Sequence, residues 1–195
     1  MTVEEIVRRV RDRSIRLASG LPVPPPPIGS DFSLSGITPL PETWKPASVL
    51  VPLVDRPEGV TVLLTQRTAD MPSHAGQVAF PGGRREPTDA DAVATALRET
   101  CEEVGITADF VSVVGAVDLY RTGTGFEITP VVGIVKPGFT IRTSAREVAD
   151  VFEVPLGHFL DEVNHEIRNR IDEKFMGAGE IFGGFVEQAR ARAQG

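Results

Sequence analysis

Short apolar runs separated by turn-forming residues dominate the chain after its first quarter. Two of these runs, 47–54 and 60–67, flank the turn residues of 55–59 and together predict a β-hairpin. Further short strands are predicted over 77–80, 111–117 and 126–135. Residues 150–160 predict a strand and a turn, and residues 181–194 predict a closing helix.

The first 30 residues follow a different pattern. Apolar residues recur at every third or fourth position between residues 3 and 17, among arginines and acids, which predicts a short amphipathic helix. The stretch LPVPPPPIGS, residues 21–30, predicts an extended polyproline segment, because prolines do not fit a helix or sheet interior. We therefore expect an N-terminal helix and Pro-rich linker over 1–30, followed by one domain over 31–195.

One strong helix is predicted over residues 91–104. Its apolar positions are three or four residues apart and form a stripe that should face the sheet, namely Val93, Ala96, Leu97, Thr100, Cys101 and Val104. Cys101 is accordingly expected to be a small core residue. Gly105 supplies the left-handed residue that ends a helix. Because strands outnumber helices, the pattern predicts a mixed α/β domain.

The composition narrows the class of protein. A chain of 195 residues is long enough to bury a full core in one domain. The formal net charge of −7 disfavours a nucleic-acid coat protein, which needs a basic stripe. The single cysteine excludes an internal disulfide, and neither a signal peptide nor an apolar run of membrane-spanning length is evident. We expect a cytoplasmic protein that contacts neither nucleic acid nor membrane.

Three acids gather on the predicted helix. At about 100° per residue, Glu99, Glu102 and Glu103 collect on roughly the side opposite the apolar stripe. Such a group is ordinarily a solvated helix face, yet acids at these spacings repel one another by about 0.2–0.5 kcal/mol per pair. A divalent cation such as Mg²⁺ would remove that repulsion. A loop with Gly82 and Gly83 precedes the helix and favours the metal interpretation, because glycines let a backbone approach a metal or phosphate closely.

The glycine loop and the acidic helix together resemble the motif of the Nudix hydrolases. That motif runs Gly, five residues, Glu, seven residues, Arg-Glu, an apolar residue, any residue, Glu-Glu, any residue, Gly and an apolar residue. Its positions are filled here by Gly83, Arg98, Glu99, Glu102, Glu103, Gly105 and Ile106. Asp89 takes the place of the first Glu and lies one residue farther from Arg98, and Thr100 takes the first apolar place. The resemblance implies a Nudix-type α/β/α sandwich with a mixed sheet and a loop-helix catalytic motif.

Residues 63–83 are similar to the segment that precedes this motif in the coenzyme A diphosphatase branch. That segment runs Leu-Leu-Thr-x-Arg-Ser/Ala, three residues, Arg, three residues, Gly, three residues and Phe-Pro-Gly-Gly. The matching positions are Leu63, Leu64, Thr65, Arg67, Gly76, Phe80, Pro81, Gly82 and Gly83. Thr68 replaces Ser or Ala, and Pro72 replaces the second arginine, which removes a guanidinium suited to phosphate.

The resemblance implies a metal-dependent diphosphatase that cuts coenzyme A or acyl-CoA into 3′,5′-ADP and 4′-phosphopantetheine derivatives. Glu99 and Glu103 would be the principal ligands of Mg²⁺ or Mn²⁺, with Glu102 completing the set and the Gly83 carbonyl as a further ligand. The metal would lower the pKa of its bound water. The proton acceptor would be a motif glutamate or Glu147. The alternative for Glu147 is a solvated loop residue without a catalytic role.

Four other positions complete the expected site. Arg98 is placed in the catalytic set as the residue that orients a glutamate through a charge-assisted hydrogen bond. Arg67, at a strand end, is expected to bind substrate phosphate, with a surface salt bridge as the alternative. His74 is a candidate nucleotide contact, and the backbone of Gly82 and Gly83 is expected to meet the substrate.

Two other functions stay open. Pro72 favours hydrolysis of another nucleoside diphosphate, such as ADP-ribose or NADH. A non-catalytic Nudix module that binds a nucleotide is disfavoured, because a pure binder has little use for three mutually repelling glutamates. In each case the partner is a small-molecule nucleotide diphosphate, and a homodimer stays open beside a monomer.

Overall fold

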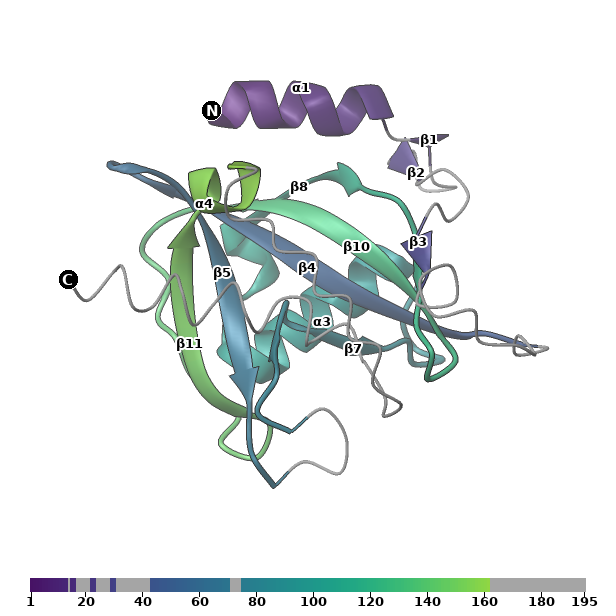
Figure 1. The fold of residues 1–195 in the computed structure, drawn as a ribbon. Helices are drawn as coiled ribbons and strands as arrows, with labels where there is room; N and C mark the ends of the chain where they lie inside the picture. Colours follow the sequence, from purple (N-terminus) through teal and green to yellow (C-terminus); the bar gives the residue numbers. More distant parts are fainter. Residues whose placement is uncertain (14, 17–21, 24–28, 31–42, 71–74, 162–195) are drawn as a thin grey trace.

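The computed structural model describes residues 1–13, 15–16, 22–23, 29–30, 43–70 and 75–161 (Figure 1). Its helices are α1 (Val3–Arg13), the 3₁₀ turn η1 (Ala108–Phe110), α3 (Ala92–Val104) and α4 (Leu156–Leu160). The longer strands are β4 (Lys45–Arg56), β5 (Gly59–Arg67), β8 (Val111–Ala116), β10 (Phe126–Val135) and β11 (Val148–Pro155). The short strands are β1 (Ile15–Arg16), β2 (Pro22–Val23), β3 (Gly29–Ser30), β6 (Val78–Ala79), β7 (Gly82–Arg84) and β9 (Tyr120–Arg121).

The main sheet is built around β4 and β10, which run parallel with Lys45 opposite Phe126 and Val54 opposite Val135. The other long strands pair antiparallel, β5 with β4, β11 with β5 and β8 with β10. The strand order of this sheet is β11-β5-β4-β10-β9-β3. The predicted mixed sheet is therefore confirmed, and the predicted hairpin is β4–β5, which turns at Gly59 with a φ of +127°.

Three layers follow from the alternation of side chains along each strand. Leu53 packs in one cluster with Ile6 of α1 and the apolar side chains of α4. Its neighbour Val54 points the other way and packs with Val104 of α3 and with Ile106. Helices α1 and α4 thus cover one face of the sheet and α3 covers the other, which confirms the α/β/α sandwich (Figure 1).

The sheet splits between β4 and β5, and this split positions the glycine loop. The two strands pair directly only from Leu53 to Arg56 on β4. Beyond that point β4 pairs with β7 and β5 pairs with β6. The Leu50 N–H donates to the Pro81 carbonyl at 2.9 Å, so the loop between β6 and β7 is held against β4. The Gly82-Gly83 backbone consequently forms part of the sheet that α3 packs against.

Some predicted features lie outside the described residues, namely most of the Pro-rich segment, His74 and the closing helix over 181–194. The predicted N-terminal helix is present but ends at Arg13, and it packs Ile6, which is 4% exposed, into the core. The boundary between 1–30 and 31–195 stays a prediction. Within the described part of the chain, no helix combines the length and apolar character needed to cross a bilayer.

Candidate active site

Helix α3 carries the acidic cluster and is fixed at both ends by its own sequence. Asp91 caps its start, since the Asp91 carboxylate accepts a hydrogen bond from the Ala94 N–H at 2.9 Å. Gly105 ends it with a φ of +78°, and its N–H donates to the Cys101 carbonyl. The predicted helix is therefore confirmed to within one residue at its start.

The buried face of α3 differs from the predicted stripe. The buried residues of the helix are Thr95, Ala96, Thr100, Glu103 and Val104. Cys101 is exposed, so its prediction as a core residue is wrong. The face is centred on positions 96, 100, 103 and 104, and Cys101 lies about 100° around the helix from Thr100. This rotation brings Glu103 inward, whereas the spacing predicted that it would point away from the sheet.

Glu103 is the most buried of the three glutamates, with 4% of its surface exposed. Its carboxylate accepts a hydrogen bond from the Gly82 N–H at 3.1 Å and lies 4.0 Å from the Arg67 guanidinium. Burial raises the pKa of Glu103 to about 7, and the charges of Glu99 and Glu147 add to the rise, while Gly82 and Arg67 oppose it. The side chain is a carboxylate whose negative charge the protein compensates only in part.

Glu99 lies one turn earlier, against the glycine loop. A Cβ added to Gly83 would stand 2.6 Å from the Glu99 carboxyl carbon, and a Cβ added to Gly82 would collide with the Ser48 carbonyl. Neither glycine has a positive φ. The two glycines are therefore required for close approach to a strand and a carboxylate, and not for a left-handed backbone conformation.

Arg98 organises the outer side of the site. Its guanidinium donates to Glu99 at 2.9 Å, to Glu102 at 3.1 Å and to the Arg84 carbonyl at 3.1 Å. It also donates two hydrogen bonds of 2.9 Å to Asp89. This geometry suits the orienting role expected for Arg98, because Glu99 is held from one side by a guanidinium that has its own fixed support.

Asp89 is the supporting residue that sequence reasoning did not place in the site. It is 7% exposed and also accepts hydrogen bonds from the Thr95 hydroxyl and the Glu86 N–H. The Arg98 hydrogen bonds hold the pKa of Asp89 well below its usual range, despite burial. The available signal was its place in the motif, five residues after Gly83, which the extra residue before Arg98 obscured.

Glu147 is brought to the helix by the loop before β11. Its N–H donates to the Ser144 carbonyl at 2.9 Å and its carbonyl accepts from the Thr68 N–H at 3.1 Å, so its backbone is held from two sides. Its charge contributes to raising the pKa of both Glu99 and Glu103, behind burial as the leading cause. Glu147 therefore lies near enough to Glu99 and Glu103 for its charge to act on both.

Glu102 and Arg67 take different positions around these three acids. The Glu102 side chain is 60% exposed and pairs with Arg98 at the surface. Arg67 extends from the end of β5, and its buried Nε has no hydrogen-bond partner among the described residues. A buried guanidinium nitrogen without a partner is costly unless a ligand or water satisfies it. Arg67 therefore has donor capacity left for an anion.

The three carboxylates suit a divalent cation by their chemistry. Among residues 1–13, 43–70 and 75–161, no group of three or more histidine, cysteine or acidic side chains is gathered tightly enough to hold a metal. Their oxygens are nevertheless hard ligands, and each charge destabilises the others in a site that burial makes less polar than water. Positive charge placed among them would relieve that cost.

The NUDIX domain profile matches residues 44–182 of this chain. That range contains the glycine loop, all of α3 and Glu147.

Curated relatives share sequence with the central part of the chain. The uncharacterized Nudix hydrolase NudL of Cronobacter sakazakii is 52% identical over 114 residues, which cover 58% of this chain and 59% of the relative. The protein of the same name in Escherichia coli K12 is 50% identical over 114 residues, with the same shares. The one in Photorhabdus laumondii is 42% identical over 133 residues, covering 64% of this chain and 71% of the relative. The chain thus matches less than two thirds of the length of the first two relatives.

Solved structures with the same fold are more distant in sequence. A C. elegans Ap4A hydrolase in a binary complex aligns with a TM-score of 0.51 at 17% identity, covering 76% of this chain and 99% of that chain. The Nudix hydrolase RenU of M. smegmatis gives 0.52 at 19% identity, covering 77% and 86%. The MutT protein of Methanosarcina mazei gives 0.50 at 21%, covering 80% and 100%. At these identities the similarity concerns the fold alone.

Proposed function

The chain belongs to the NUDIX family, and we propose on that premise that it is a metal-dependent hydrolase of diphosphate bonds in nucleotide derivatives. We propose further that its substrate is coenzyme A or acyl-CoA and that the products are 3′,5′-ADP and 4′-phosphopantetheine derivatives. The observation that supports the proposal is the position of Glu99 and Glu103 against the Gly82-Gly83 backbone, where the charge of Glu147 also acts on both.

The residues that would hold Mg²⁺ or Mn²⁺ are Glu99 and Glu103, with Glu102 and the Gly83 carbonyl as further ligands. When bound, such an ion neutralises charge on the diphosphate and lowers the pKa of a bound water. Arg98 keeps Glu99 in place through its 2.9 Å hydrogen bond, and the Gly82 N–H does the same for Glu103. The protein therefore orients the two carboxylates before any ligand arrives.

Hydrolysis also needs an acceptor for the proton of the attacking water. Glu147 and Glu103 are the candidates, because both are carboxylates in the cluster. Glu147 is supported by its position, since the Ser144 and Thr68 backbone contacts hold it near α3 without using its carboxylate. Glu103 is the candidate from the motif, and its Gly82 hydrogen bond and its proposed place as a metal ligand leave it less free to take up a proton.

Arg67 is proposed to bind the diphosphate. It stands at the end of β5 beside Glu103, and its Nε has no partner in the described part of the chain. Guanidinium groups bind phosphate oxygens through two parallel N–H donors. His74 and the backbone of Gly82 and Gly83 remain proposed substrate contacts, and His74 lies outside the described residues.

The choice of coenzyme A rests on the register of residues 63–83 with the branch segment. Pro72 stands where that segment has an arginine, so one charge-assisted contact is missing. Such a contact is worth about 1.5–3 kcal/mol, or roughly ten- to a hundredfold in affinity. We therefore expect coenzyme A to be cleaved with a high KM and a preserved kcat, and Pro72→Arg to lower the KM.

A substrate panel tests the proposal. Release of 3′,5′-ADP from coenzyme A is measured with Mg²⁺ and with Mn²⁺, beside hydrolysis of ADP-ribose and NADH, in the natural protein and in Pro72→Arg. Coenzyme A is expected to have the highest kcat/KM. A tenfold preference for ADP-ribose or NADH in both proteins would contradict the coenzyme A proposal and leave a Nudix hydrolase of another nucleoside diphosphate. Absence of any metal-dependent turnover would favour the binding-module alternative.

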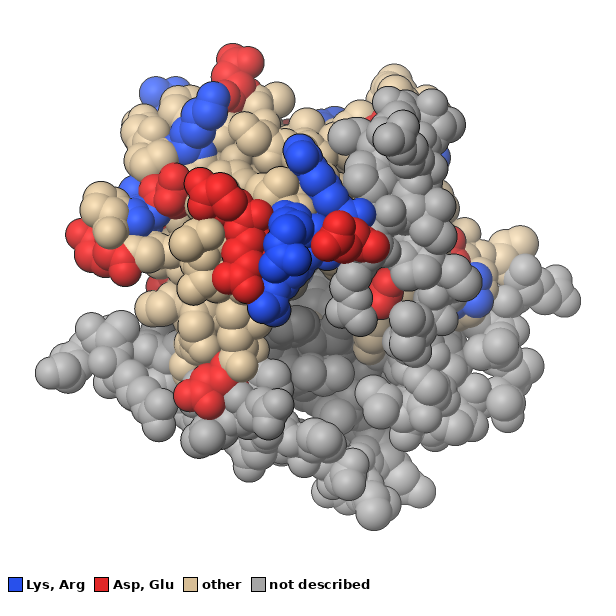
Figure 2. Space-filling view, turned by 90° about the horizontal axis from the view of Figure 1, so that it is seen from above, with Lys and Arg blue, Asp and Glu red and all other residues tan. Residues whose placement is uncertain are grey.

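The remaining expectations concern the setting of this activity. On the side of the molecule that carries α1, acidic and basic side chains are interspersed, without a continuous basic stripe in the described surface (Figure 2). Together with the net charge of −7, this supports a small-molecule substrate over a nucleic acid. A cytoplasmic location and the choice between monomer and homodimer stay proposals for fractionation and light scattering to decide.

A further inference from the structure

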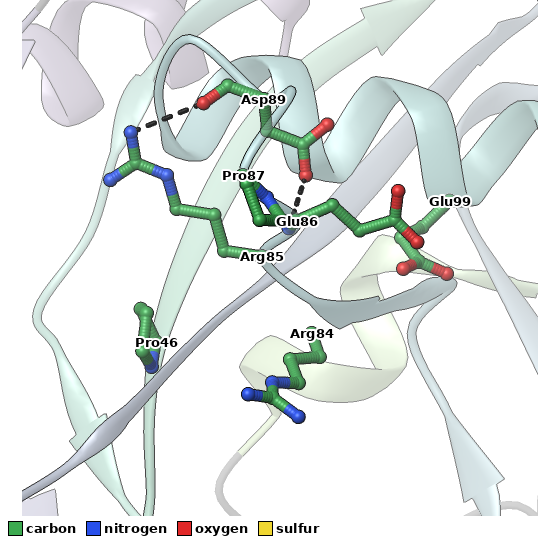
Figure 3. A pocket seen from close by; sticks show the side chains of 7 residues that line it. All are labelled: Pro46, Arg84, Arg85, Glu86, Pro87, Asp89 and Glu99. Carbon is green, nitrogen blue, oxygen red and sulfur yellow. Dashed lines mark hydrogen bonds between the residues drawn. The ribbon is translucent and has the colours of Figure 1, made fainter.

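A pocket of about 700 Å³ opens beside the carboxylate cluster (Figure 3). Its lining residues are Pro46, Arg84, Arg85, Glu86, Pro87, Asp89 and Glu99. Glu99 belongs both to this pocket and to the proposed metal site, so the two sites adjoin. The volume is within the range of small-molecule sites. The pocket therefore extends the candidate active site beyond the residues that the motif contains.

The two arginines of the pocket differ in their contacts. The Arg85 guanidinium donates to the Asp89 carbonyl at 3.2 Å and to the Ala90 carbonyl at 2.8 Å, so it braces the loop before α3. The Arg84 side chain is exposed and makes no hydrogen bond or ion pair within residues 1–13, 43–70 and 75–161. In Figure 3 the Arg84 guanidinium points away from the side chains of Glu86 and Glu99. Within the described part of the chain, Arg84 is thus the pocket arginine whose guanidinium donors have no partner.

The backbone of Arg84 is held firmly although its side chain is not. Arg84 pairs with Ala47 across β7 and β4, and its carbonyl accepts a hydrogen bond from Arg98 at 3.1 Å. The neighbouring Arg85 N–H donates to the Pro46 carbonyl at 3.0 Å. A fixed Cα lowers the entropy that the side chain loses when it binds a ligand. The guanidinium is therefore presented from a rigid strand next to Gly83 and Glu99.

The acids of the pocket decide what kind of group Arg84 can receive. Asp89 and Glu99 both accept hydrogen bonds from Arg98, whereas the Glu86 side chain forms no ion pair with another described residue. An anion that approached Glu99 directly would be repelled, whereas one that approached the Arg84 wall would meet five N–H donors in a planar fork. That arrangement suits a group with several anionic oxygens, of which phosphate is the natural match.

We propose that Arg84 binds a phosphate group of the substrate in this pocket and so sets substrate specificity. The inference rests on the proposed function, because it assumes a substrate that carries phosphates. Two parts of a coenzyme A molecule have this chemistry, the diphosphate and the ribose 3′-phosphate. Arg84 is a binding residue in this scheme and takes no part in proton transfer.

Steady-state kinetics of Arg84→Gln, with coenzyme A and 3′-dephospho-coenzyme A as substrates, test the proposal. We expect the KM to rise about tenfold with kcat within about twofold of the natural protein. Arg84→Lys keeps the charge but loses the planar fork, so it should recover part of the affinity. Arg8→Gln is the control, since Arg8 lies on α1 outside the pocket and the change in net charge is the same.

The two substrates identify which phosphate is bound. A KM that rises for coenzyme A alone assigns Arg84 to the 3′-phosphate, and a KM that rises for both assigns it to the diphosphate. Either result supports the proposal. An Arg84→Gln variant whose KM for both substrates stays within about twofold of the natural value, or whose kcat falls with KM unchanged, would overturn it.

A binding measurement separates this inference from the proposed function. Calorimetric titration of 3′,5′-ADP into the protein in EDTA requires no turnover. Weaker binding by Arg84→Gln, by about tenfold, supports a phosphate contact even where coenzyme A is not cleaved. Equal affinity in the natural protein, Arg84→Gln and Arg8→Gln would reject the contact, whatever the substrate panel shows.

Discussion

Two glutamates near opposite ends of β5 show how differently the same side chain is used. Glu153 of β11 receives two hydrogen bonds from Arg56, one of them at 3.0 Å, and another from the Thr61 hydroxyl. Glu103 of α3 receives one from the Gly82 N–H and lies 4.0 Å from Arg67. Burial acts to raise the pKa of both. At Glu153 the Arg56 and Thr61 hydrogen bonds outweigh burial and lower the pKa, whereas at Glu103 burial wins.

The difference separates a stabilising ion pair from a candidate ligand-binding site. Arg56 and Glu153 hold the β4–β5 hairpin to β11, and their donors and acceptors meet directly. The Arg67 guanidinium lies 4.0 Å from the Glu103 carboxylate, and the Arg67 Nε has no partner among the described residues. Perturbed carboxylates of the second kind are common at functional sites, because the cost of charge is relieved on binding.

The largest expected effect is on catalysis. Glu103→Gln should lower kcat by at least about a hundredfold, because it removes a charge from the proposed metal site. Glu153→Gln, the matched control, should change kcat by less than about twofold. Steady-state rates with coenzyme A and Mg²⁺, with circular dichroism to check folding, measure both. A folded Glu103→Gln protein with near-normal turnover would remove Glu103 from the site.

The same variant should stabilise the metal-free protein at high pH. The pKa of Glu103 rises on folding from its ordinary value of 4.5 to about 7, so ionisation costs stability as the pH rises through this interval, and the full cost applies above it. Glutamine has no charge to bury. At about 1.4 kcal/mol per pKa unit, the gain in unfolding free energy is at most about 3.5 kcal/mol near pH 8 and disappears near pH 4.

Urea unfolding of both proteins in EDTA at the two pH values provides this measurement. A difference that is the same at both pH values would show that the substitution acts through packing and not through the charge of Glu103.

Glu153→Gln should have the opposite effect on stability. Hydrogen bonds from Arg56 and Thr61 lower the pKa of Glu153, so the ionised side chain stabilises the protein at neutral pH. The variant lacks this stabilisation at every pH, and the natural protein loses it when acid protonates Glu153. We expect a loss of about 1–2 kcal/mol, reduced from the buried case because both side chains are partly exposed. Glu58→Gln in the adjacent turn is the control. An equal loss of unfolding free energy in that variant would show that the Arg56–Glu153 pair is not the cause.

The smallest effect concerns metal binding without substrate. Mg²⁺ at about ten times its Kd should stabilise the natural protein by about 1.4 kcal/mol, which corresponds to about 3–5 °C in Tm for a chain of this size. Glu103→Gln should show a shift below about 1 °C, and Glu153→Gln should keep the full shift from its lower starting Tm. Differential scanning calorimetry in EDTA and in Mg²⁺ resolves these changes. Equal shifts in all three proteins would locate the ion elsewhere.

Most of the elements were predictable because their signals are local. The β4–β5 hairpin follows from two apolar runs around a turn, and α3 follows from a stripe of apolar positions that ends at Gly105. The centre of the buried stripe was less predictable. Thr100 and Glu103 are buried and Cys101 is exposed, because the split between β4 and β5 sets how the helix is rotated on the sheet.

The sequence by itself determined which residues could take part in a metal-assisted hydrolysis, since the spacing of Gly83, Arg98, Glu99 and Glu103 is a property of the chain alone. Only the tertiary structure decided their states. It buried Glu103 against Gly82 and paired Arg98 with Asp89, and among the described residues it left guanidinium donors of Arg67 and Arg84 without a partner. The physical reason is that desolvation and charge pairing depend on neighbours distant along the chain, which periodicity does not encode.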